Sequence, residues 1–531
     1  MASGPSRPNH LSEDHLEELS STVRDWQFTH GSLLKAAPYS GKSYAYPIGV
    51  SLFPSNFPRR LFESALDLQR IFNQLYSAVA NDGVWLYHML RNQIMNDPAS
   101  MAAILWNIHT NAISSGITQP VSLGIYRSDY MLHAPTPTDD MSLKQVEFNT
   151  YSVAGGSHSN LISQMHSHLA GTGAYQQDPS PLRPSLPANN TIEGIADALS
   201  LTHEHYCPVA PDGPSAVLFV VQPNNVNIAD ERPIEYALND RQIRCFRVEF
   251  GGEIMARTSL DARKALLFHP IYAPEDPVEI SVVYHRAGYN VEEYDAAGRA
   301  CRLHLEVSRA IKCPSILGHL ATLKMVQQQL TKRENLSRFM GDEEVETILA
   351  VCMPMYPLDD SKEGKKSKEI VRDGTQVKNH VLKPCLEGGG HNIFGGQIPG
   401  HLRQLRKEGN TGEDLVLMEL IQPPDVRNVL MSPIQGGYSG SVVSELGVFG
   451  ASMWRSTATR RSQKTDDQEY YEEEDGLREE EGDHSKEEDK ERDENILLNR
   501  QIGFSFKTKR RSVKEMSVVK GYGCFDSPFL I

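Results

Sequence analysis

The sequence lacks the features that characterise secreted, membrane-spanning or disulfide-rich proteins. Its seven cysteines are scattered, are odd in number and form no Cys-x-x-Cys pair, so neither a disulfide framework nor a zinc site is indicated. The N-terminal segment is polar and has no apolar signal-peptide core, and no run of roughly 18 apolar residues occurs anywhere. We therefore expect a cytoplasmic protein in a reducing environment, without membrane association.

Most of the chain also lacks net charge. The total is −15, but residues 466–494 alone hold 17 Asp and Glu against four Lys and Arg, which leaves −2 for the rest. A nearly neutral body gives no support for a nucleic-acid or anionic-membrane partner. The acidic segment has few apolar residues, so we expect a disordered insertion at residues 462–496, and a solvated loop is favoured there over a binding tail.

The 531 residues, 39% of them hydrophobic, suffice for two or three domains with a substantial core. Apolar spacing predicts helices and strands in alternation, with a Pro- and Ser-rich loop at residues 176–190. The strands at 121–132 and 143–151 are expected to form an antiparallel hairpin. The expected helices cover residues 11–26, 61–75 with a continuation to 95, 232–238 and 317–331, and the other expected strands cover 216–222, 280–286, 377–382, 415–421 and 442–451.

A glycine-rich segment follows the strand-like run 377–382. Three consecutive glycines, Gly388, Gly389 and Gly390, let the backbone approach an anion, while Lys383 can neutralise phosphate and Glu387 can hold a magnesium ion. The spacing matches neither a Walker loop nor a dinucleotide fingerprint. The glycines alone are equally typical of a surface turn, and the flanking lysine and glutamate favour nucleotide binding.

A second pattern suits a hard cation. Glu147 and Asn149 are two residues apart in an expected strand, so both oxygen-bearing side chains lie on one face, and Glu387 could complete the set. By itself this spacing is more typical of a solvated sheet face. Together with the glycine-rich segment it favours a metal site.

Four segments, in this order along the chain, resemble the eukaryotic glutathione synthetases, which are permuted members of the ATP-grasp superfamily. They are residues 126–130 with 145–150, residues 311–328, residues 381–392 and residues 443–450. The chain looks like a divergent, fungal-like member. The resemblance implies an α/β (α+β) fold of the circularly permuted ATP-grasp type, with parts at residues 1–213 and 317–531 and an inserted α/β substrate-binding domain at 214–316.

The resemblance also implies an ATP site with two Mg²⁺ ions. In the family, lysines contact the phosphates, the glycine-rich loop closes over them, and a hinge strand pairs with the adenine. Carried onto this sequence, the ATP-site residues are Glu147, Lys324, Lys383, Glu387, Gly388, Gly389, Gly390, His391, Asn392, Phe394, Met418, Glu419, Leu420, Ile421, Glu445, Lys509 and Glu515, and the metal ligands are Glu147, Asn149 and Glu387.

The family's dipeptide substrate, γ-glutamylcysteine, carries two carboxylates, so bidentate arginines are expected. Isolated arginines are usually surface ion pairs, and only the motifs favour substrate contact here. The implied substrate-binding residues are Arg127, Ser152, Asn227, Glu231, Arg286, Tyr289, Lys507, Val518 and Val519.

Two places depart from the family pattern. Residues 153–157 are one residue short, so a second serine beside Ser152 is missing. Near the C-terminus, Lys507 stands where the family has arginine, and Met516 and Ser517 stand where the family has two glycines in a mobile lid. An ammonium cannot make the planar fork of a guanidinium, and the lid lacks glycine's conformational freedom.

These observations predict an ATP- and magnesium-dependent glutathione synthase that joins γ-glutamylcysteine to glycine through an acyl phosphate. The resemblance implies a homodimer. Two alternatives stay open at this point: a ligase for a different amine or dipeptide, and a catalytically weak paralogue that binds nucleotide or partners a true synthetase.

Overall fold

The computed structural model describes residues 12–36, 43–116, 119–136, 139–175, 185–209, 213–384, 392–409, 412, 414–456 and 495–531. The predictions for Glu387, Gly388, Gly389, Gly390 and His391, and for the acidic segment 466–494, lie outside these residues. Within them, no helix has the length and apolar character needed to cross a membrane.

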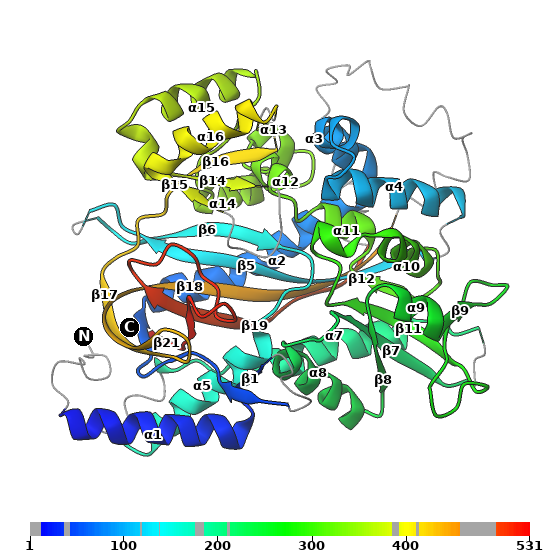
Figure 1. Cartoon of the computed structure of the whole chain (residues 1–531), viewed down its shortest axis with the longest axis horizontal. Coiled ribbons are helices and arrows are strands. Elements are labelled where there is room, and N and C mark those ends of the chain that lie inside the picture. The colour runs from blue at the N-terminus through cyan, green and yellow to red at the C-terminus, as the bar shows by residue number, and fades with distance from the viewer. Residues whose placement is uncertain are drawn as a thin grey trace.

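A 13-stranded mixed sheet forms the centre of the molecule (Figure 1). Its main path runs β17-β3-β20-β19-β18-β5-β12-β11-β10-β9, while β6 pairs with β5, and β7 pairs with β11 and β8. The strands are β3 (Val50–Ser51), β5 (Val121–His133), β6 (Ser142–Asn149), β7 (Ser215–Val221), β8 (Arg244–Glu249), β9 (Thr258–Leu260), β10 (Leu266–Phe268), β11 (Val278–His285), β12 (Ile311–Cys313), β17 (Val426–Ser432), β18 (Gly436–Arg455), β19 (Ile496–Arg510) and β20 (Cys524–Phe525).

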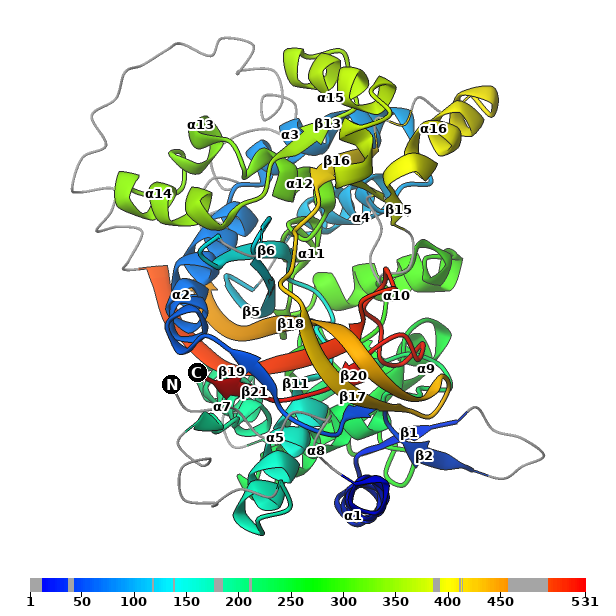
Figure 2. The ribbon, with the colours of Figure 1, turned by 90° about the vertical axis from the view of Figure 1, so that its left-hand side faces the viewer.

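A four-stranded sheet, of order β13-β16-β14-β15, lies beside β6 with α15 and α16 on its outer side (Figures 1 and 2). It carries the segments on both sides of the glycine-rich run. Two further pairs, β1 with β2 and β21 with β4, complete the strands. These strands are β1 (Leu33–Lys35), β2 (Ala45–Pro47), β4 (Ser55–Phe57), β13 (Met355–Pro357), β14 (His380–Pro384), β15 (Ile393–Phe394), β16 (Leu415–Glu419) and β21 (Pro528–Leu530).

Helices cover the faces of the sheets. The helix α1 begins after Ser12, whose hydroxyl accepts the N–H of His15, as is typical of an N-terminal cap. The helices are α1 (Glu13–His30), α2 (Arg59–Asn81), α3 (Gly83–Asn96), α4 (Met101–Ser114), α5 (Gly156–Gly171), α7 (Thr191–His205), α8 (Ile228–Asp240), α9 (Gly252–Arg257), α10 (Ala296–Glu306), α11 (Ile316–Leu320), α12 (Lys324–Gln329), α13 (Arg333–Leu336), α14 (Asp342–Val351), α15 (Lys362–Arg372) and α16 (Ile398–Lys407).

The predicted mixed α/β class, the β5–β6 antiparallel hairpin and the first three helices are confirmed. Two predictions are wrong in detail. The helix expected at 317–331 is divided into α11 and α12, because Leu323 has an extended backbone with ψ of 141°. The strand expected at 377–382 begins only at His380, because residues Gln376–Asn379 form a 3₁₀ turn.

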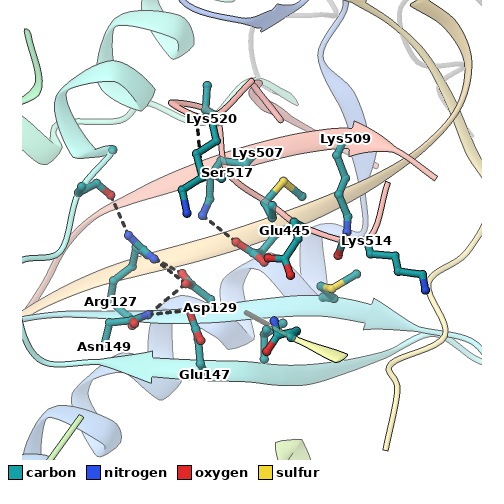
Figure 3. A pocket seen from close by; sticks show the side chains of 18 of the residues that line it. Arg127, Asp129, Glu147, Asn149, Glu445, Lys507, Lys509, Lys514, Ser517 and Lys520 are labelled. Carbon is teal, nitrogen blue, oxygen red and sulfur yellow. Dashed lines mark hydrogen bonds and ion pairs between the residues drawn. The ribbon is translucent and has the colours of Figure 1, made fainter. Parts of the chain in front are cut away.

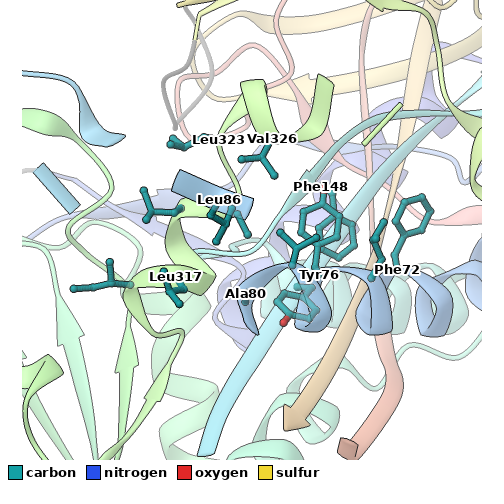
Figure 4. Close-up of a cluster of buried hydrophobic side chains, with 14 of the residues drawn as sticks. Phe72, Tyr76, Ala80, Leu86, Phe148, Leu317, Leu323 and Val326 are labelled. Atoms are coloured by element: carbon teal, nitrogen blue, oxygen red, sulfur yellow. The ribbon is translucent and has the colours of Figure 1, made fainter. Parts of the chain in front are cut away.

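The helix α2 anchors the largest apolar core. Its apolar residues recur every three or four positions, and this spacing places them on one face. Tyr76 stacks on Phe148 of β6 with ring centroids 3.9 Å apart, and Phe72 lies 5.5 Å from the same ring (Figure 4). Burying each such side chain contributes about 1.5–3 kcal/mol, so α2 holds β5 and β6 firmly in place.

The central sheet divides along one edge of β5. Ser122 near its start pairs in parallel with Lys312 of β12, whereas from Arg127 onward β5 pairs with β6. Beyond β12, strands β11, β7 and β8 run parallel, with α7 and α8 among the helices packed on them. The α/β unit predicted between residues 214 and 316 therefore shares a continuous sheet with β5, and the domain boundaries themselves stay a prediction.

Candidate active site

A cavity of about 630 Å³ lies where β5, β6, β18 and β19 face the four-stranded sheet and the C-terminal loop. Segments far apart in the sequence meet here, from Arg127 to Phe525. The predicted site residues that line it are Arg127, Glu147, Asn149, Ser152, Asn227, Arg286, Tyr289, Lys383, Asn392, Phe394, Met418, Glu419, Leu420, Ile421, Glu445, Lys507, Lys509, Glu515, Val518 and Val519.

Two predicted residues stand just behind the cavity wall. Lys324, the first residue of α12, lies with its Nζ 3.0 Å from Glu147 Oε2. Glu231, on α8, lies 3.6 Å from Arg286 Nε and accepts a 2.7 Å hydrogen bond from Arg247. Each is thus paired with a side chain that lines the cavity.

The cavity floor is a set of cross-strand pairs on the β5–β6 hairpin (Figure 3). Arg127 pairs with Asn149 and Asp129 with Glu147, and the two-residue period of a strand puts all four on one face. Arg127 donates to both oxygens of Asp129, at 2.6 and 2.7 Å, and Asn149 Nδ2 donates to Asp129 Oδ2 at 3.1 Å. Asp129 thus holds an arginine and an amide in fixed directions.

Two lysines converge on Glu147. Burial alone would raise the pKa of Glu147, but the ammonium groups of Lys324 and Lys383 outweigh burial and hold it well below its usual range. Burial lowers the pKa of Lys383 to about 8, although Glu147 opposes the shift, and its Nζ donates to the Val146 carbonyl at 2.7 Å. An anion beside Lys383 would favour its charged form.

A second carboxylate enters from β18. Glu445 Oε1 lies 2.7 Å from Nζ of Lys507, its cross-strand partner on β19. Burial raises the pKa of Glu445, and the nearby Asp129 and Glu147 raise it further, while Lys507 opposes the shift. Next along β19, Lys509 donates to the Lys514 carbonyl at 2.6 Å. Lys507, one of the expected substrate-binding residues, is thus already paired with a glutamate.

The donor set suits a hard cation in its chemistry. Glu147 offers carboxylate oxygens, and the hydrogen bonds from Asn149 Nδ2 to Asp129 leave the Asn149 amide oxygen as the atom that could take a metal. The third predicted ligand, Glu387, lies outside the described residues. Among those described, no group of three or more His, Cys, Asp and Glu side chains is arranged to hold a metal ion.

The wall toward the central α/β unit is built around Arg286 and Asp230. Arg286 is buried and donates to Asp230 Oδ2 at 3.0 Å and to the Val153 carbonyl at 2.8 Å. Asp230 also accepts the N–H groups of Gly155 and Ser157 at the start of α5. Arg286 lowers the pKa of Asp230 against the effect of burial. This network shapes the loop that presents Ser152.

Ser152 itself adopts a left-handed backbone with φ of 49°, which is uncommon for a residue other than glycine. Such strain persists only where the surroundings enforce it. On the same wall, the Glu293 carboxylate accepts three backbone N–H groups, those of Gly288, Tyr289 and Asn290. Hydrogen bonds to Asp230 and to Glu293 thus fix the loops that carry Ser152 and Tyr289 at the cavity.

The C-terminal loop forms the roof. Residues 513–520 line the cavity, and the Lys514 ammonium lies 5.2 Å from the centre of the Phe394 ring on β15. Figure 3 shows Ser517 and Lys520 above Glu445, with Lys514 to one side of it. A cation over an aromatic face is attractive, so this contact joins the lid to the sheet that carries the glycine-rich segment.

Sequence reasoning missed Asp129 and Asp230. Asp129 stands two residues after Arg127 in a strand, so the period of two could have placed the pair together. Asp230 lies inside the stretch 227–231 that had been singled out, but its link to Arg286 joins segments 56 residues apart. The sequence carries no signal for that contact.

The comparisons with known proteins converge on one family. Residues 13–530 match the model described as "Eukaryotic glutathione synthase, ATP binding domain". The chain is 30% identical over 538 residues to the glutathione synthetase large chain of Schizosaccharomyces pombe, covering 97% of each, and 32% identical over 449 residues to glutathione synthetase of Mus musculus, covering 84% of this chain and 90% of that protein. Among solved structures it is similar to a glutathione synthetase-like effector from Globodera pallida, with a TM-score of 0.70 and 19% identity over 99% of both chains.

Proposed function

Because this chain belongs to the eukaryotic glutathione synthase family, we propose that it synthesises glutathione as an ATP-dependent carbon–nitrogen ligase that acts through an acyl phosphate, on a fold of the ATP-grasp type. The substrates are γ-glutamylcysteine, glycine and ATP. The observation that carries the proposal is the floor of the cavity, where Arg127, Lys383 and Lys507 face the carboxylates of Glu147 and Glu445.

In the first step an oxygen of the cysteinyl carboxylate attacks the γ-phosphorus of ATP. The new O–P bond forms as the bond to the β-phosphate oxygen breaks, and ADP leaves. Lys383 neutralises the charge that spreads over the phosphoryl oxygens, and Arg127 orients the attacking carboxylate. The two side chains are held in place by hydrogen bonds, from Lys383 to the Val146 carbonyl and from Arg127 to the Asp129 carboxylate.

In the second step the glycine amine attacks the acyl carbon. The C–N bond forms, phosphate leaves with the electron pair of the C–O bond, and the ammonium proton passes to solvent or to the departing phosphate. No side-chain nucleophile takes part, so catalysis consists of positioning, charge neutralisation and exclusion of water. Lys507 is the proposed partner of the glycine carboxylate, although its ammonium group is also paired with Glu445.

Two Mg²⁺ ions are proposed to be held by Glu147, Asn149 and Glu387. When bound, they would neutralise phosphate charge and align the phosphoryl oxygens. The adenine is assigned to the strand end at residues 418–421. The assignments of Glu147, Asn149 and residues 418–421 are supported by their common position at the cavity, and all of the assignments are supported by the family's ATP-binding description.

One observation favours a second candidate, a related ligase with another acceptor amine. The Lys507–Glu445 pair at 2.7 Å reduces the positive charge available to a glycine carboxylate. A third candidate, a catalytically weak nucleotide-binding partner of a true synthetase, would bind ATP without turnover. We further propose that the protein is a homodimer in the cytoplasm. Light scattering of the purified chain would check its oligomeric state.

Phosphate release from ATP in the presence of γ-glutamylcysteine separates these candidates. Glycine, β-alanine and serine are compared as acceptors at saturating ATP and magnesium. Glutathione synthesis predicts the highest kcat/KM with glycine. A preference for another amine would support the second candidate, and ATP binding without phosphate release would support the third.

A further inference from the structure

The glycine at position 447 of β18 lies directly beneath the Arg127–Asp129 pair. Gly447 is the cross-strand partner of Asp129 on β5 and of Ser505 on β19. A Cβ built on it would lie 2.6 Å from Asp129 Oδ1, 2.9 Å from Arg127 Cδ and 2.5 Å from Ser505 Oγ. All three distances are shorter than real Cβ contacts, so any side chain here would displace its neighbours.

The Arg127–Asp129 pair has little freedom to move aside. Asp129 is 1% exposed, and its two oxygens accept three hydrogen bonds, two from Arg127 and one from Asn149. Arg127 is held further by its donation to the Ala154 carbonyl at 2.8 Å. A shift of Asp129 would therefore carry the arginine with it, because the two side chains are joined by two hydrogen bonds.

Backbone geometry does not require glycine at this position. Gly447 is absent from the residues with positive φ, so an alanine could adopt its extended conformation. The other glycine of the motif, Gly450, has a different reason: its Cβ would lie 2.2 Å from Asn73 Oδ1, on the face that packs against α2. Gly450 serves helix packing, whereas Gly447 faces the side chains of the cavity.

We propose that Gly447 is a positioning residue that sets where Arg127 presents its guanidinium to the substrate carboxylate. The inference rests on the proposed function, since it takes Arg127 as the group that orients γ-glutamylcysteine. Because residue 447 has no side chain, Asp129 and Arg127 can lie in close contact with the backbone of β18. The absence of a side chain at residue 447 is then a specificity feature for the dipeptide and not for ATP.

The test is Gly447→Ala, compared with wild type and with Gly437→Ala. Gly437 lies exposed near the other end of β18 and has no atom within 4 Å of a built Cβ. We expect the KM for γ-glutamylcysteine to rise about ten-fold or more in Gly447→Ala, since small misplacements of a positioning group have effects of this size. The KM for ATP should stay within about two-fold in both variants.

A double-mutant cycle with Arg127→Ala separates positioning from general disruption. If Gly447 acts through Arg127, adding Gly447→Ala to Arg127→Ala should leave the KM for γ-glutamylcysteine unchanged. Should Gly447→Ala fail to fold, Ser505→Ala/Gly447→Ala removes the 2.5 Å contact with the Ser505 hydroxyl and keeps the contacts with Asp129 and Arg127, so this variant should fold and still show the raised KM for γ-glutamylcysteine. A KM for γ-glutamylcysteine equal to that of Ser505→Ala alone would overturn the proposal.

Two further results would overturn it: an unchanged KM for γ-glutamylcysteine in Gly447→Ala, or an equal effect of Gly447→Ala with and without Arg127. Failure of the proposed function looks different, because wild type would then release no phosphate from ATP with γ-glutamylcysteine. In that case calorimetric titration with γ-glutamylcysteine still compares wild type and Gly447→Ala, and equal affinity of the two would sink the inference.

Discussion

At the scale of single residues, Lys507 has the most consequential environment in the cavity. Its ammonium is paired at 2.7 Å with Glu445, and both side chains are nearly buried. An ammonium is a compact point charge, so engagement with Glu445 weakens its attraction for a second carboxylate. A guanidinium could donate to Glu445 with one N–H and to an acceptor carboxylate with others.

Lys507→Arg should therefore lower the KM for glycine by about ten-fold, which corresponds to roughly 1–2 kcal/mol. The measurement is steady-state kinetics with varied glycine at saturating ATP and γ-glutamylcysteine. The KM for ATP serves as the internal control. An unchanged or raised KM for glycine would mean that residue 507 does not face the acceptor carboxylate, or that the enzyme is tuned to another amine.

Asp526 is a second residue with an unusual environment, on the opposite side of β19 from Lys507. It is fully buried and accepts hydrogen bonds from Ser55 and Thr508, each at 2.6 Å. Burial raises the pKa of Asp526 to about 6 despite these donors. The nearby His166 has its pKa lowered to about 3 by burial, so it stays neutral where Asp526 titrates.

An acid with a higher pKa in the folded chain than in the unfolded chain binds its proton more tightly when folded. Its contribution to stability is therefore complete below about pH 4 and is lost as the pH rises through about 6. The free energy of unfolding of wild type relative to Asp526→Asn should fall by up to about 3 kcal/mol between pH 4 and pH 8. Urea unfolding at a series of pH values measures this difference, and a pH-independent difference would contradict it.

At the scale of elements, the β18–β19 hairpin organises the site. It carries Glu445, Gly447, Lys507 and Lys509, and its register continues to Trp454 opposite Ile496 at the far end. The acidic segment 466–494 lies between these two ends in the sequence. The residues that line the cavity are near the other end of the hairpin, away from the strand ends at Arg455 and Ile496.

Deletion of residues 466–494 should leave the fold and the ATP affinity largely unchanged. The segment holds 17 acidic residues and few apolar ones, so it has little to bury. The paired ends of β18 and β19 would remain joined by residues 456–465 and 495. Thermal melting and nucleotide titration of the deleted protein provide the measurement. Loss of cooperative melting would show that the segment is part of the folded structure.

At the scale of the whole molecule, the cavity joins three parts of the chain. The hairpin β5–β6, the loops of the central α/β unit and the C-terminal strands and lid all contribute side chains. A ligand bound there contacts all three and stabilises the folded state by mass action. At one hundred times its Kd this stabilisation amounts to about 2.7 kcal/mol.

Glu387→Gln should reduce the stabilisation of the folded protein by magnesium and ATP without reducing the stability of the ligand-free protein. The variant removes a proposed magnesium ligand from a glycine-rich segment with little apolar surface, so ligase activity should fall far more than stability. The rise in melting temperature with magnesium and ATP is compared in wild type and variant, together with turnover. Near-normal turnover of the variant at the magnesium concentration used for wild type would contradict the assignment of Glu387 as a metal ligand.

The sequence alone determined the features that depend on local pattern. Apolar spacing predicted α2 and the β5–β6 hairpin, because helix and strand periods differ and both segments are long. It did not predict the break at Leu323 or the turn before His380, because apolar residues continue past Leu323 and Val377 fits the pattern of the strand that follows, while tertiary contacts decide where the backbone changes direction. The family resemblance named the residues that meet at the cavity, and most of those described do line it.

Only the tertiary structure decided how those residues are paired. The contacts of Asn149 with Asp129, of Asp230 with Arg286 and of Glu445 with Lys507 join different strands or distant segments. Such pairings depend on the register of the sheet and on burial, which strengthens the attraction between opposite charges. Neither the register nor the burial can be predicted from a short stretch of sequence. The residue types in the site could thus be predicted from the sequence. The pairing of their charges and the position of Gly447, without a side chain, beside Arg127 and Asp129 follow from the packing of β18 between β5 and β19.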